Sequence, residues 1–194
     1  MPRRVLIVNG HPEPRPSTFV AALASAYAAG AAAAGHDVRR IDIGALNLPP
    51  LRSAAEFAAP PSIAAVIDAQ NDIAWCDPLV IVHPLWHGMQ PALLKAFFEQ
   101  TFRHGFAVTD ETRNFPKPLL GGRSARIVVT MGMPAFIYRW WFGSAATRAL
   151  AAGLLRLSGL KPVRQTVVGG TGGLTPAKAA AHLKAMGALG RRAA

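Results

Sequence analysis

Short runs of aliphatic residues, separated by longer stretches rich in alanine, make up most of this chain. A compact aliphatic run is typical of a strand buried on both faces of a parallel sheet. A long alanine-rich stretch bounded by capping residues is typical of a helix. The pattern predicts strands over Arg4–Asn9, Val38–Ile43, Leu79–Val82, Arg126–Thr130 and Val163–Val168.

Helices are expected between these strands, and local signals mark the ends of two of them. Ser17 or Thr18 is a good N-cap for a helix that runs as far as Gly35, which stops it. Thr175 followed by Pro176 marks the start of the last helix in the same way. The other helices are expected over residues 62–76, 92–102 and 140–159, and the polar, proline-containing stretch 106–122 is expected to run over the surface.

Strands that alternate with helices and are joined by short loops indicate a doubly wound α/β fold. Five strands favour one parallel sheet in the order 2-1-3-4-5, covered by helices on both faces, as in the three-layer sandwich of flavodoxin-like folds. The 194 residues, 51% of them hydrophobic and 16% charged, are enough to bury one large core. Because no repeat or linker interrupts the pattern, we expect a single domain over residues 1–194.

Charge and cysteine content narrow the classes of partner. The formal net charge of +11 would permit contact with nucleic acid or anionic lipid. However, the arginines form scattered pairs such as Arg39-Arg40 and Arg191-Arg192 and do not gather on one predicted helix. This distribution favours a surface that attracts anionic cofactors over a groove that binds nucleic acid. Cys76 is the single cysteine, so an intrachain disulfide is excluded, and we expect a small buried side chain in a reducing compartment.

The first apolar run lies close to Met1 and is too short for a signal-peptide core or a membrane span. We therefore expect a cytoplasmic protein without an integral membrane segment. No carboxylate pair and no His or Cys cluster has the spacing of metal ligands, and no Gly-x-Ser-x-Gly motif is present. Neither a metal site nor serine-hydrolase chemistry is expected.

The loop after the first strand, residues 10–19, lies at the amino terminus of a predicted helix. Free backbone N–H groups and the helix dipole there favour a phosphate. Ser17 and Thr18 can add hydroxyl donors, and His11 can donate a hydrogen bond or carry part of the counter-charge. The glycine spacing matches neither a dinucleotide-binding fingerprint nor a P-loop, so a single phosphate is favoured. In the alternative interpretation, Ser17 is an ordinary N-cap and His11 an ordinary loop residue.

The loop after the third strand is rich in flat rings. Pro84 stops the strand, Trp86 and His87 follow, Gly88 lets the backbone turn, and Pro91 supplies a fixed φ for the next helix. Open α/β sheets bind ligands at the carboxyl ends of their strands, so planar rings at this position suit a planar ligand.

Loops that leave parallel strands meet at one edge of the sheet, so residues 10–19, 84–90 and 130–138 are expected to converge. Gly132 in the third loop would allow a ligand to approach the backbone closely. A phosphate joined by a short polar chain to a flat, mostly apolar ring system describes flavin mononucleotide (FMN). The three loops therefore predict an FMN site.

Three stretches resemble the flavodoxin-like NAD(P)H:quinone oxidoreductase family. Residues 83–102 resemble its second flavin loop, with the aromatic, Pro-x-x-Leu-Lys and Glu-x-x-Phe elements in order. Residues 10–19 resemble its phosphate loop. Thr130-Met131-Gly132, with Tyr138 eight residues after the threonine, resembles its third loop. The similarity spans nearly the whole chain.

The resemblance implies a homodimer with a non-covalently bound flavin, either FMN or FAD, that passes hydride from NAD(P)H to a quinone or similar small acceptor by a ping-pong mechanism. It also implies that Tyr138 handles charge on the reduced flavin. Mammalian-type members have a histidine six residues after that tyrosine, where this chain has Ser144. The implied flavin contacts are His11, Ser17, Thr18, Phe19, Pro84, Leu85, Trp86, His87, Gly88, Thr130, Met131 and Gly132.

Two other functions stay open at this point. A flavin-binding ancillary subunit of a membrane transporter, like the members of the resembled family that accompany potassium-efflux transporters, would turn over poorly and use the aromatic stretch 138–142 to meet its partner. A basic nucleic-acid-binding α/β module would bind with steep salt dependence and carry no flavin. In an enzyme, we expect the same aromatic stretch to be core and subunit interface, or a wall of the acceptor pocket.

Overall fold

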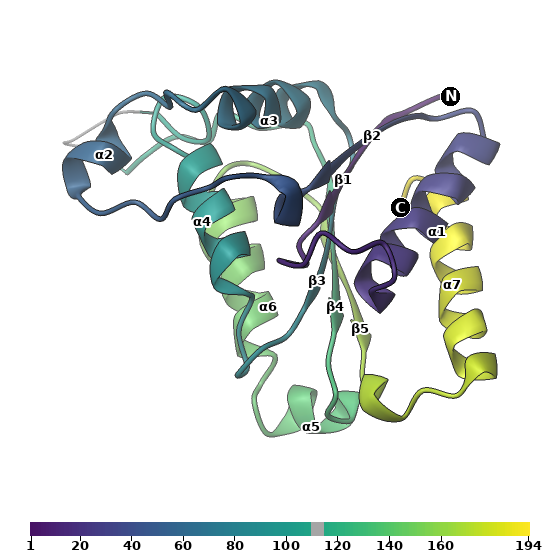
Figure 1. The fold of residues 1–194 in the computed structure, drawn as a ribbon. Helices are drawn as coiled ribbons and strands as arrows, with labels where there is room; N and C mark the ends of the chain where they lie inside the picture. Colours follow the sequence, from purple (N-terminus) through teal and green to yellow (C-terminus); the bar gives the residue numbers. More distant parts are fainter. Residues whose placement is uncertain (110–114) are drawn as a thin grey trace.

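The structure, a computed structural model, describes residues 1–109 and 115–194. At its centre is one parallel five-stranded sheet with the order β2-β1-β3-β4-β5, shown in Figure 1. This is the predicted order, so the predicted fold class is confirmed. The strands are β1 (Arg4–Asn9), β2 (Asp37–Asp42), β3 (Leu79–Pro84), β4 (Ala125–Thr130) and β5 (Val163–Val168).

Helices cover both faces of the sheet (Figure 1). On one face α1 (Phe19–Ala33) packs lengthwise against α7 (Pro176–Arg191). On the other face lie α3 (Ala64–Trp75), α4 (Ala92–Thr101) and α6 (Ala145–Ala149), which continues as a π-helical stretch over Leu150–Arg156. None of the helices in the described ranges has the length and apolar character needed to cross a bilayer.

The expected helix over residues 140–159 is wrong in its first part. The chain instead forms a short helix, α5 (Ala135–Trp140), then turns, and α6 begins at Ala145. The break lies at Gly143 and Ser144, which both have positive φ angles, 55° and 53°, that no right-handed helix accepts. A second short helix, α2 (Ala54–Ala58), begins after the N-cap Ser53 and had not been predicted.

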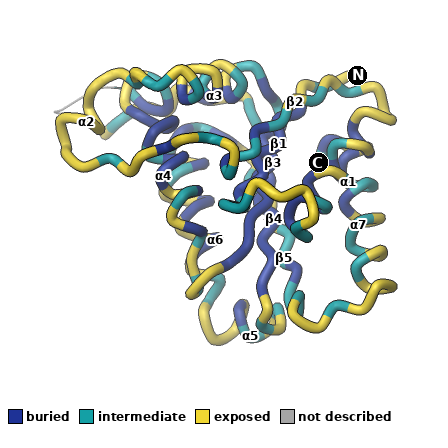
Figure 2. Tube along the Cα trace, viewed as in Figure 1, coloured by how far each residue is buried: buried dark blue, intermediate teal, exposed yellow. Residues whose placement is uncertain are grey.

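The central strands β1, β3 and β4 are buried on both faces, as their aliphatic runs predicted, whereas the edge strands β2 and β5 keep exposed positions. In β1, Leu6 and Val8 point into the core under α3 and α4, whereas Val5 and Ile7 point into the core under α1 and α7. Figure 2 shows this buried centre with exposed positions around the periphery. Cys76 lies in the first of these cores, where burial raises the pKa of its thiol to about 12. It is therefore the small buried residue that the sequence predicted.

The predicted surface excursion over residues 106–122 is described only in part, because residues 110–114 lie outside the described ranges. The two flanking segments pair with each other. The Thr109 N–H donates to the Lys117 carbonyl at 2.9 Å, and the Leu119 N–H donates to the Ala107 carbonyl at 3.0 Å. Ala107 and Leu120 are buried, so this segment also contributes to the core.

Candidate functional site

Three loops lie along one edge of the sheet, where β1, β3 and β4 end. We call these loops, residues 10–18, 85–91 and 131–134, the rim. The three strands are adjacent and parallel, and their register pairs Asn9 with Val82 and Pro84 with Thr130. The Gly10 N–H donates to the Val82 carbonyl at 2.7 Å, and the Leu85 N–H donates to the Thr130 carbonyl at 2.7 Å. The carboxyl ends of the strands therefore present the three predicted loops side by side.

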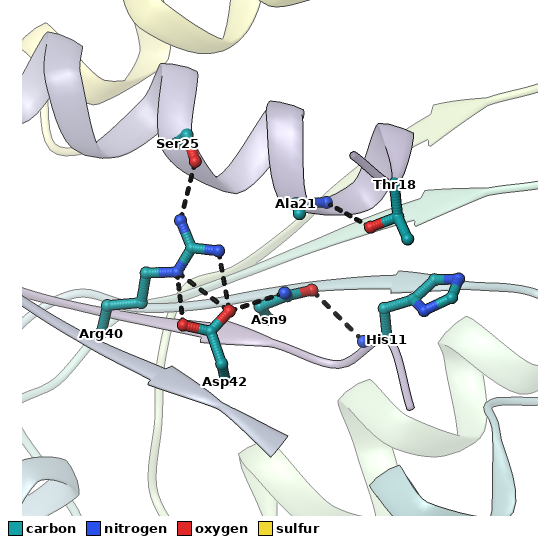
Figure 3. A network of polar contacts seen from close by, with 7 residues as sticks. All are labelled: Asn9, His11, Thr18, Ala21, Ser25, Arg40 and Asp42. Carbon is teal, nitrogen blue, oxygen red and sulfur yellow. Dashed lines mark hydrogen bonds and ion pairs between the residues drawn. The ribbon is translucent and has the colours of Figure 1, made fainter. Parts of the chain in front are cut away.

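The first loop is held by a polar network that reaches across to β2, drawn in Figure 3. Arg40 forks onto both carboxylate oxygens of Asp42 and also reaches the hydroxyl of Ser25 at 2.8 Å. Asn9 donates from Nδ2 to Asp42 Oδ1 at 2.7 Å, and its own Oδ1 accepts from the His11 N–H at 3.3 Å. The backbone of the first loop is thus tied to the neighbouring strand.

Asp42 is charged within this network. Burial acts to raise the pKa of its carboxyl, but hydrogen bonds from Arg40 and Asn9 outweigh burial, so the pKa lies below its ordinary value. Asp42, Asn9 and Arg40 were not predicted as parts of this loop's support. One available signal was a polar Asn9 at the end of an otherwise aliphatic strand.

The amino terminus of α1 lies at this first loop. Thr18 is its N-cap, with Oγ1 accepting from the Ala21 N–H at 3.2 Å. The first-turn N–H groups of Phe19 and Val20 have no intrahelical acceptor, and no acidic side chain stands in this turn. Ser17 is exposed beside them. Two backbone donors, a hydroxyl and the positive end of a helix dipole fit an anion such as a phosphate.

His11 has a defined tautomer in its neutral form. Its Nδ1 accepts from the Glu13 N–H at 3.1 Å, so the ring proton is on Nε2. The ring meets Trp86 of the second loop edge-on, with 5.9 Å between centroids and 83° between planes. The first two loops are therefore in contact, and His11 keeps an Nε2–H donor for a ligand.

The second loop is a tight turn that carries its rings outward. Trp86 and Met89 exchange backbone hydrogen bonds of 2.8 and 2.9 Å, and between them His87 and Gly88 have φ angles of 48° and 79°. Two central residues with positive φ are the signature of a type I′ turn. Trp86 is 47% exposed, so about half of the residue's surface is available at the rim. Pro91 is the N-cap of α4, which begins at Ala92 as predicted.

The third loop is fastened to the loop after β5. The Met131 N–H donates to the Val168 carbonyl at 2.9 Å, and the Gly170 N–H donates to the Met133 carbonyl at 2.9 Å. Gly132 is exposed, and a Cβ built on it would meet no atom of the described chain within 4 Å. The chain itself does not require glycine at this position. We therefore still predict that glycine stands here because a ligand approaches the backbone closely.

The second and third loops share a small apolar cluster. Leu85 and Met131 pack there with Val129, Tyr138 and Ala146. Together with the contact between His11 and Trp86, this cluster links the three loops into one continuous rim.

Several predicted site residues point inward, away from the rim surface. Tyr138 is fully buried, and its hydroxyl accepts from the Thr147 N–H at 3.1 Å. In this arrangement the hydroxyl is not presented at the rim, which argues against the predicted role of Tyr138 in proton handling. The ring of Phe19 lies against His182 of α7, with 6.4 Å between centroids. Pro84, Thr130 and Met131 are also buried and could meet a ligand only through small exposed portions.

A buried histidine lies directly beneath the rim. His83 in β3 is 1% exposed, with Nδ1 2.9 Å from the Pro84 carbonyl and Nε2 without a hydrogen-bond partner among the described residues. Burial lowers the pKa of this imidazole to about 4, so the ring is neutral at ordinary pH. The His83 side chain also packs close to Gly10, because a Cβ on Gly10 would stand 2.9 Å from His83 Cβ.

An apolar groove of about 380 Å³ opens beside the second loop. Met89 and Gln90 form its end nearest the rim, and α4 and α6 form its walls. Lys95 and Glu99 are its only charged lining residues among those described, and they pair with each other across one turn of α4. No group of three or more His, Cys, Asp or Glu side chains that could hold a metal ion occurs in the described ranges.

Comparisons with known proteins identify similar folds. A family model described as a flavodoxin-like fold matches residues 3–189. No curated protein matches the chain. The solved structure of Smu.1420 from Streptococcus mutans UA159 is similar with a TM-score of 0.81 and 22% identity, covering 97% of this chain and 98% of that one.

Two further similar structures have functional names. The NAD(P)H:quinone oxidoreductase from Methanothermobacter marburgensis has a TM-score of 0.78 and 20% identity, covering 99% of this chain and 97% of that one. An FMN-dependent NADH-azoreductase from Bacillus anthracis str. Ames Ancestor, in complex with FMN, has a TM-score of 0.77 and 16% identity, covering 98% of each chain. At these identities the similarity shows the fold alone.

Proposed function

Since this chain belongs to the flavodoxin-like fold family, which it matches over residues 3–189, we propose that it is a flavin-dependent NAD(P)H oxidoreductase. FMN would lie along the rim, NAD(P)H would donate hydride, and a quinone or similar small molecule would accept it. The names of the similar structures from Methanothermobacter marburgensis and Bacillus anthracis support this assignment.

The observation that carries the proposal is the contact between the first two loops of the rim. A helix amino terminus suited to a phosphate lies in the same loop as His11, whose ring touches Trp86 of the second loop. An anion site and a half-exposed indole held side by side match a ligand with a phosphate at one end and a flat ring system at the other.

Each residue would have a distinct task in holding FMN. The first-turn N–H groups of α1 and the Ser17 hydroxyl would bind the phosphate, while Thr18 caps the helix that presents them. His11 would donate from Nε2, and Trp86 would pack against the ring system. The tight turn at His87 and Gly88 would bring backbone groups to the ring edge, opposite Gly132.

Bound FMN would supply the hydride-accepting chemistry, and the protein would position the ring and exclude water from one side of it. The donor and the acceptor would visit the same exposed face of the rim in turn. A shared site of this kind predicts ping-pong kinetics, seen as parallel double-reciprocal lines. Intersecting lines would contradict a shared site.

Reconstitution with flavin tests the function directly. The purified chain should turn yellow with FMN or FAD, retain the flavin through gel filtration, and oxidise NADH or NADPH when a soluble quinone is added. A chain that stays colourless and binds oligonucleotides with steep salt dependence would overturn the proposal in favour of a nucleic-acid-binding module. Tight flavin binding with negligible turnover would instead favour an ancillary subunit.

The groove between α4 and α6 supports a homodimer, which the resemblance implies and which we propose together with a cytoplasmic location. The groove is mostly apolar and opens at Met89 of the second loop, so a second copy seated there would also wall the ligand. Light scattering after gel filtration should give twice the chain mass. Leu154→Glu, which places a charge in the groove, should shift the protein to monomers, whereas Arg156→Glu on the neighbouring exposed surface should not.

A further inference from the structure

The short helix α5 and the residues after it carry a group of exposed aromatic rings, which we call the aromatic tip. It is formed by Phe136, Trp140, Trp141 and Phe142, whose exposed fractions are 64%, 87%, 84% and 43%. Figure 1 shows α5 beyond the ends of β4 and β5, at an extremity of the molecule. Large aromatic side chains this exposed usually meet a partner.

Packing and hydrogen bonds hold the backbone of the aromatic tip in place. Tyr138, on the inner side of α5, is fully buried and bonded to Thr147. The Trp141 N–H donates to the Ile137 carbonyl at 2.9 Å, and the Ser144 N–H donates to the Tyr138 carbonyl at 3.0 Å. Behind α5 the backbone packs so closely that a Cβ on Gly169 would stand 2.3 Å from the Ala135 nitrogen. The exposed rings therefore belong to an ordered surface.

Charge is divided unevenly along the chain. All 10 acidic residues precede residue 112, together with 8 of the 21 Lys and Arg residues, and the other 13 follow with no acidic residue among them. Ion pairs between described residues follow this division, since those such as Arg3–Asp77 and Arg39–Asp72 all lie before residue 100. The part of the chain that contains the aromatic tip, from residue 112 onward, is therefore strongly basic.

Two arginines belong to the immediate surroundings of the tip. Arg139 lies within α5 and Arg148 in α6, and both are exposed. Arg148 reaches the Gly143 carbonyl at 3.5 Å, which holds it beside the turn that follows the tip. Indole rings next to guanidinium groups are the combination that favours the interface of an anionic bilayer.

We propose that the aromatic tip docks the protein onto an anionic lipid bilayer, with Trp140 and Trp141 entering the headgroup region and Arg139 and Arg148 contacting lipid phosphates. The positive charge after residue 111 complements such a surface. It disfavours a second copy seated on the same patch in a symmetric dimer, because like charges would face each other. The rings project from a tip at an extremity, whereas nucleic-acid stacking sites line a groove.

Docking would bring the rim to the bilayer. The third loop, residues 131–134, leads directly into α5, so a membrane held at Trp140 lies next to the proposed flavin site. Apolar electron acceptors such as long-chain quinones dissolve in the bilayer. This step rests on the proposed function and deepens it, since it names lipid-dissolved quinones as the acceptor class; docking itself does not depend on flavin chemistry.

Cosedimentation of the full chain with vesicles tests the docking. The chain should sediment with vesicles of phosphatidylcholine and phosphatidylglycerol, remain in solution with phosphatidylcholine alone, and release at high salt. The double variant W140S/W141S should bind the vesicles at least about fivefold more weakly. Because both tryptophans are highly exposed, the substitutions should leave the fold intact.

A charge-matched pair of variants locates the contact. R139Q/R148Q should weaken vesicle binding and flatten its salt dependence. R191Q/R192Q removes the same charge at the far end of α7, where the Ala193 carbonyl accepts from Arg3, and should retain most binding. Equal binding by W140S/W141S and the unchanged chain, or equal loss in both arginine pairs, would overturn the proposal. Loss of single-stranded oligonucleotide binding in the tip variants, without vesicle binding in any sample, would assign the tip to nucleic acid.

The acceptor class is tested with the flavin-loaded protein. W140S/W141S should lower kcat/KM about fivefold for a long-chain quinone embedded in anionic vesicles and leave turnover of a water-soluble quinone unchanged. Equal loss with both quinones would contradict the acceptor assignment. Vesicle binding by a chain that takes up no flavin would uphold docking and overturn only the proposed function.

Discussion

Asn9 at the end of β1 donates a 2.7 Å hydrogen bond to Asp42 at the end of β2, and its carbonyl oxygen accepts from the backbone of His11. One side chain thus joins two strands to the loop that carries the proposed phosphate site. The register of β1 against β2 explains this contact, since Asn9 and Asp42 are paired positions in the parallel ladder.

Replacing Asp42 should loosen the first loop. In Asp42→Asn the fork from Arg40 is lost, and we expect FMN affinity to fall about fivefold because the loop backbone is less well positioned. Flavin fluorescence titration measures the affinity. Asp72→Asn is the matched control, since it breaks a similar Arg–Asp pair with Arg39, outside the rim, and should leave FMN affinity unchanged. Equal losses in both variants would contradict a positioning role for Asp42.

A substitution at Gly132 should affect ligand binding without affecting the stability of the fold. Since a Cβ there would meet nothing in the described chain, Gly132→Val should leave the urea midpoint unchanged and weaken FMN binding about tenfold if the loop lies against the flavin. Gly169→Ala is the opposite control, because its Cβ would stand 2.3 Å from a backbone nitrogen and should cost about 1 to 3 kcal/mol of stability. Unchanged FMN affinity in Gly132→Val would remove the third loop from the site.

Tyr138 is expected to support the rim without taking part in proton transfer. Tyr138→Phe keeps the ring in its apolar cluster and removes the hydroxyl that accepts from Thr147, so stability should fall by about 1 kcal/mol. Because the hydroxyl is buried, kcat and its pH profile should stay nearly unchanged. A loss of kcat by two orders of magnitude, with a shifted pH profile, would restore Tyr138 to proton handling.

His83 should make the fold sensitive to mild acid. Its pKa falls from about 6.5 in the unfolded chain to about 4 when folded, so between these values the unfolded state binds the extra proton. The free energy of unfolding should therefore be highest above pH 6.5 and fall as the pH drops towards 4, by about 2 kcal/mol at pH 5. Urea unfolding at several pH values measures this, and His83→Gln should remove most of the slope across that window.

The flavodoxin-like architecture could be predicted because its main signals are local. Aliphatic runs such as residues 79–82 need burial on both faces, and Thr18 and Thr175 mark helix starts through their own side chains. The rim followed from the same signals, because parallel strands must release their loops at one edge. The contact between His11 and Trp86 is the structural outcome of that rule.

Other features depended on contacts between distant parts of the chain. The pairing of Asn9 with Asp42 arises from strand register, which no local pattern encodes. The break in the helix expected over residues 140–159 depends on Ser144 adopting a left-handed conformation that its residue type does not require. The family resemblance implied that Tyr138 lies at the flavin, yet Tyr138 packs inward against Leu85 and Met131.

The sequence by itself therefore determined which segments are strands and helices and at which edge the loops emerge, because hydrophobic periodicity and capping act over a few residues. Only the tertiary structure decided which side chains of those loops face solvent, which aromatic rings of α5 are left exposed, and which polar groups meet. These outcomes depend on the summed packing of many residues far apart in sequence.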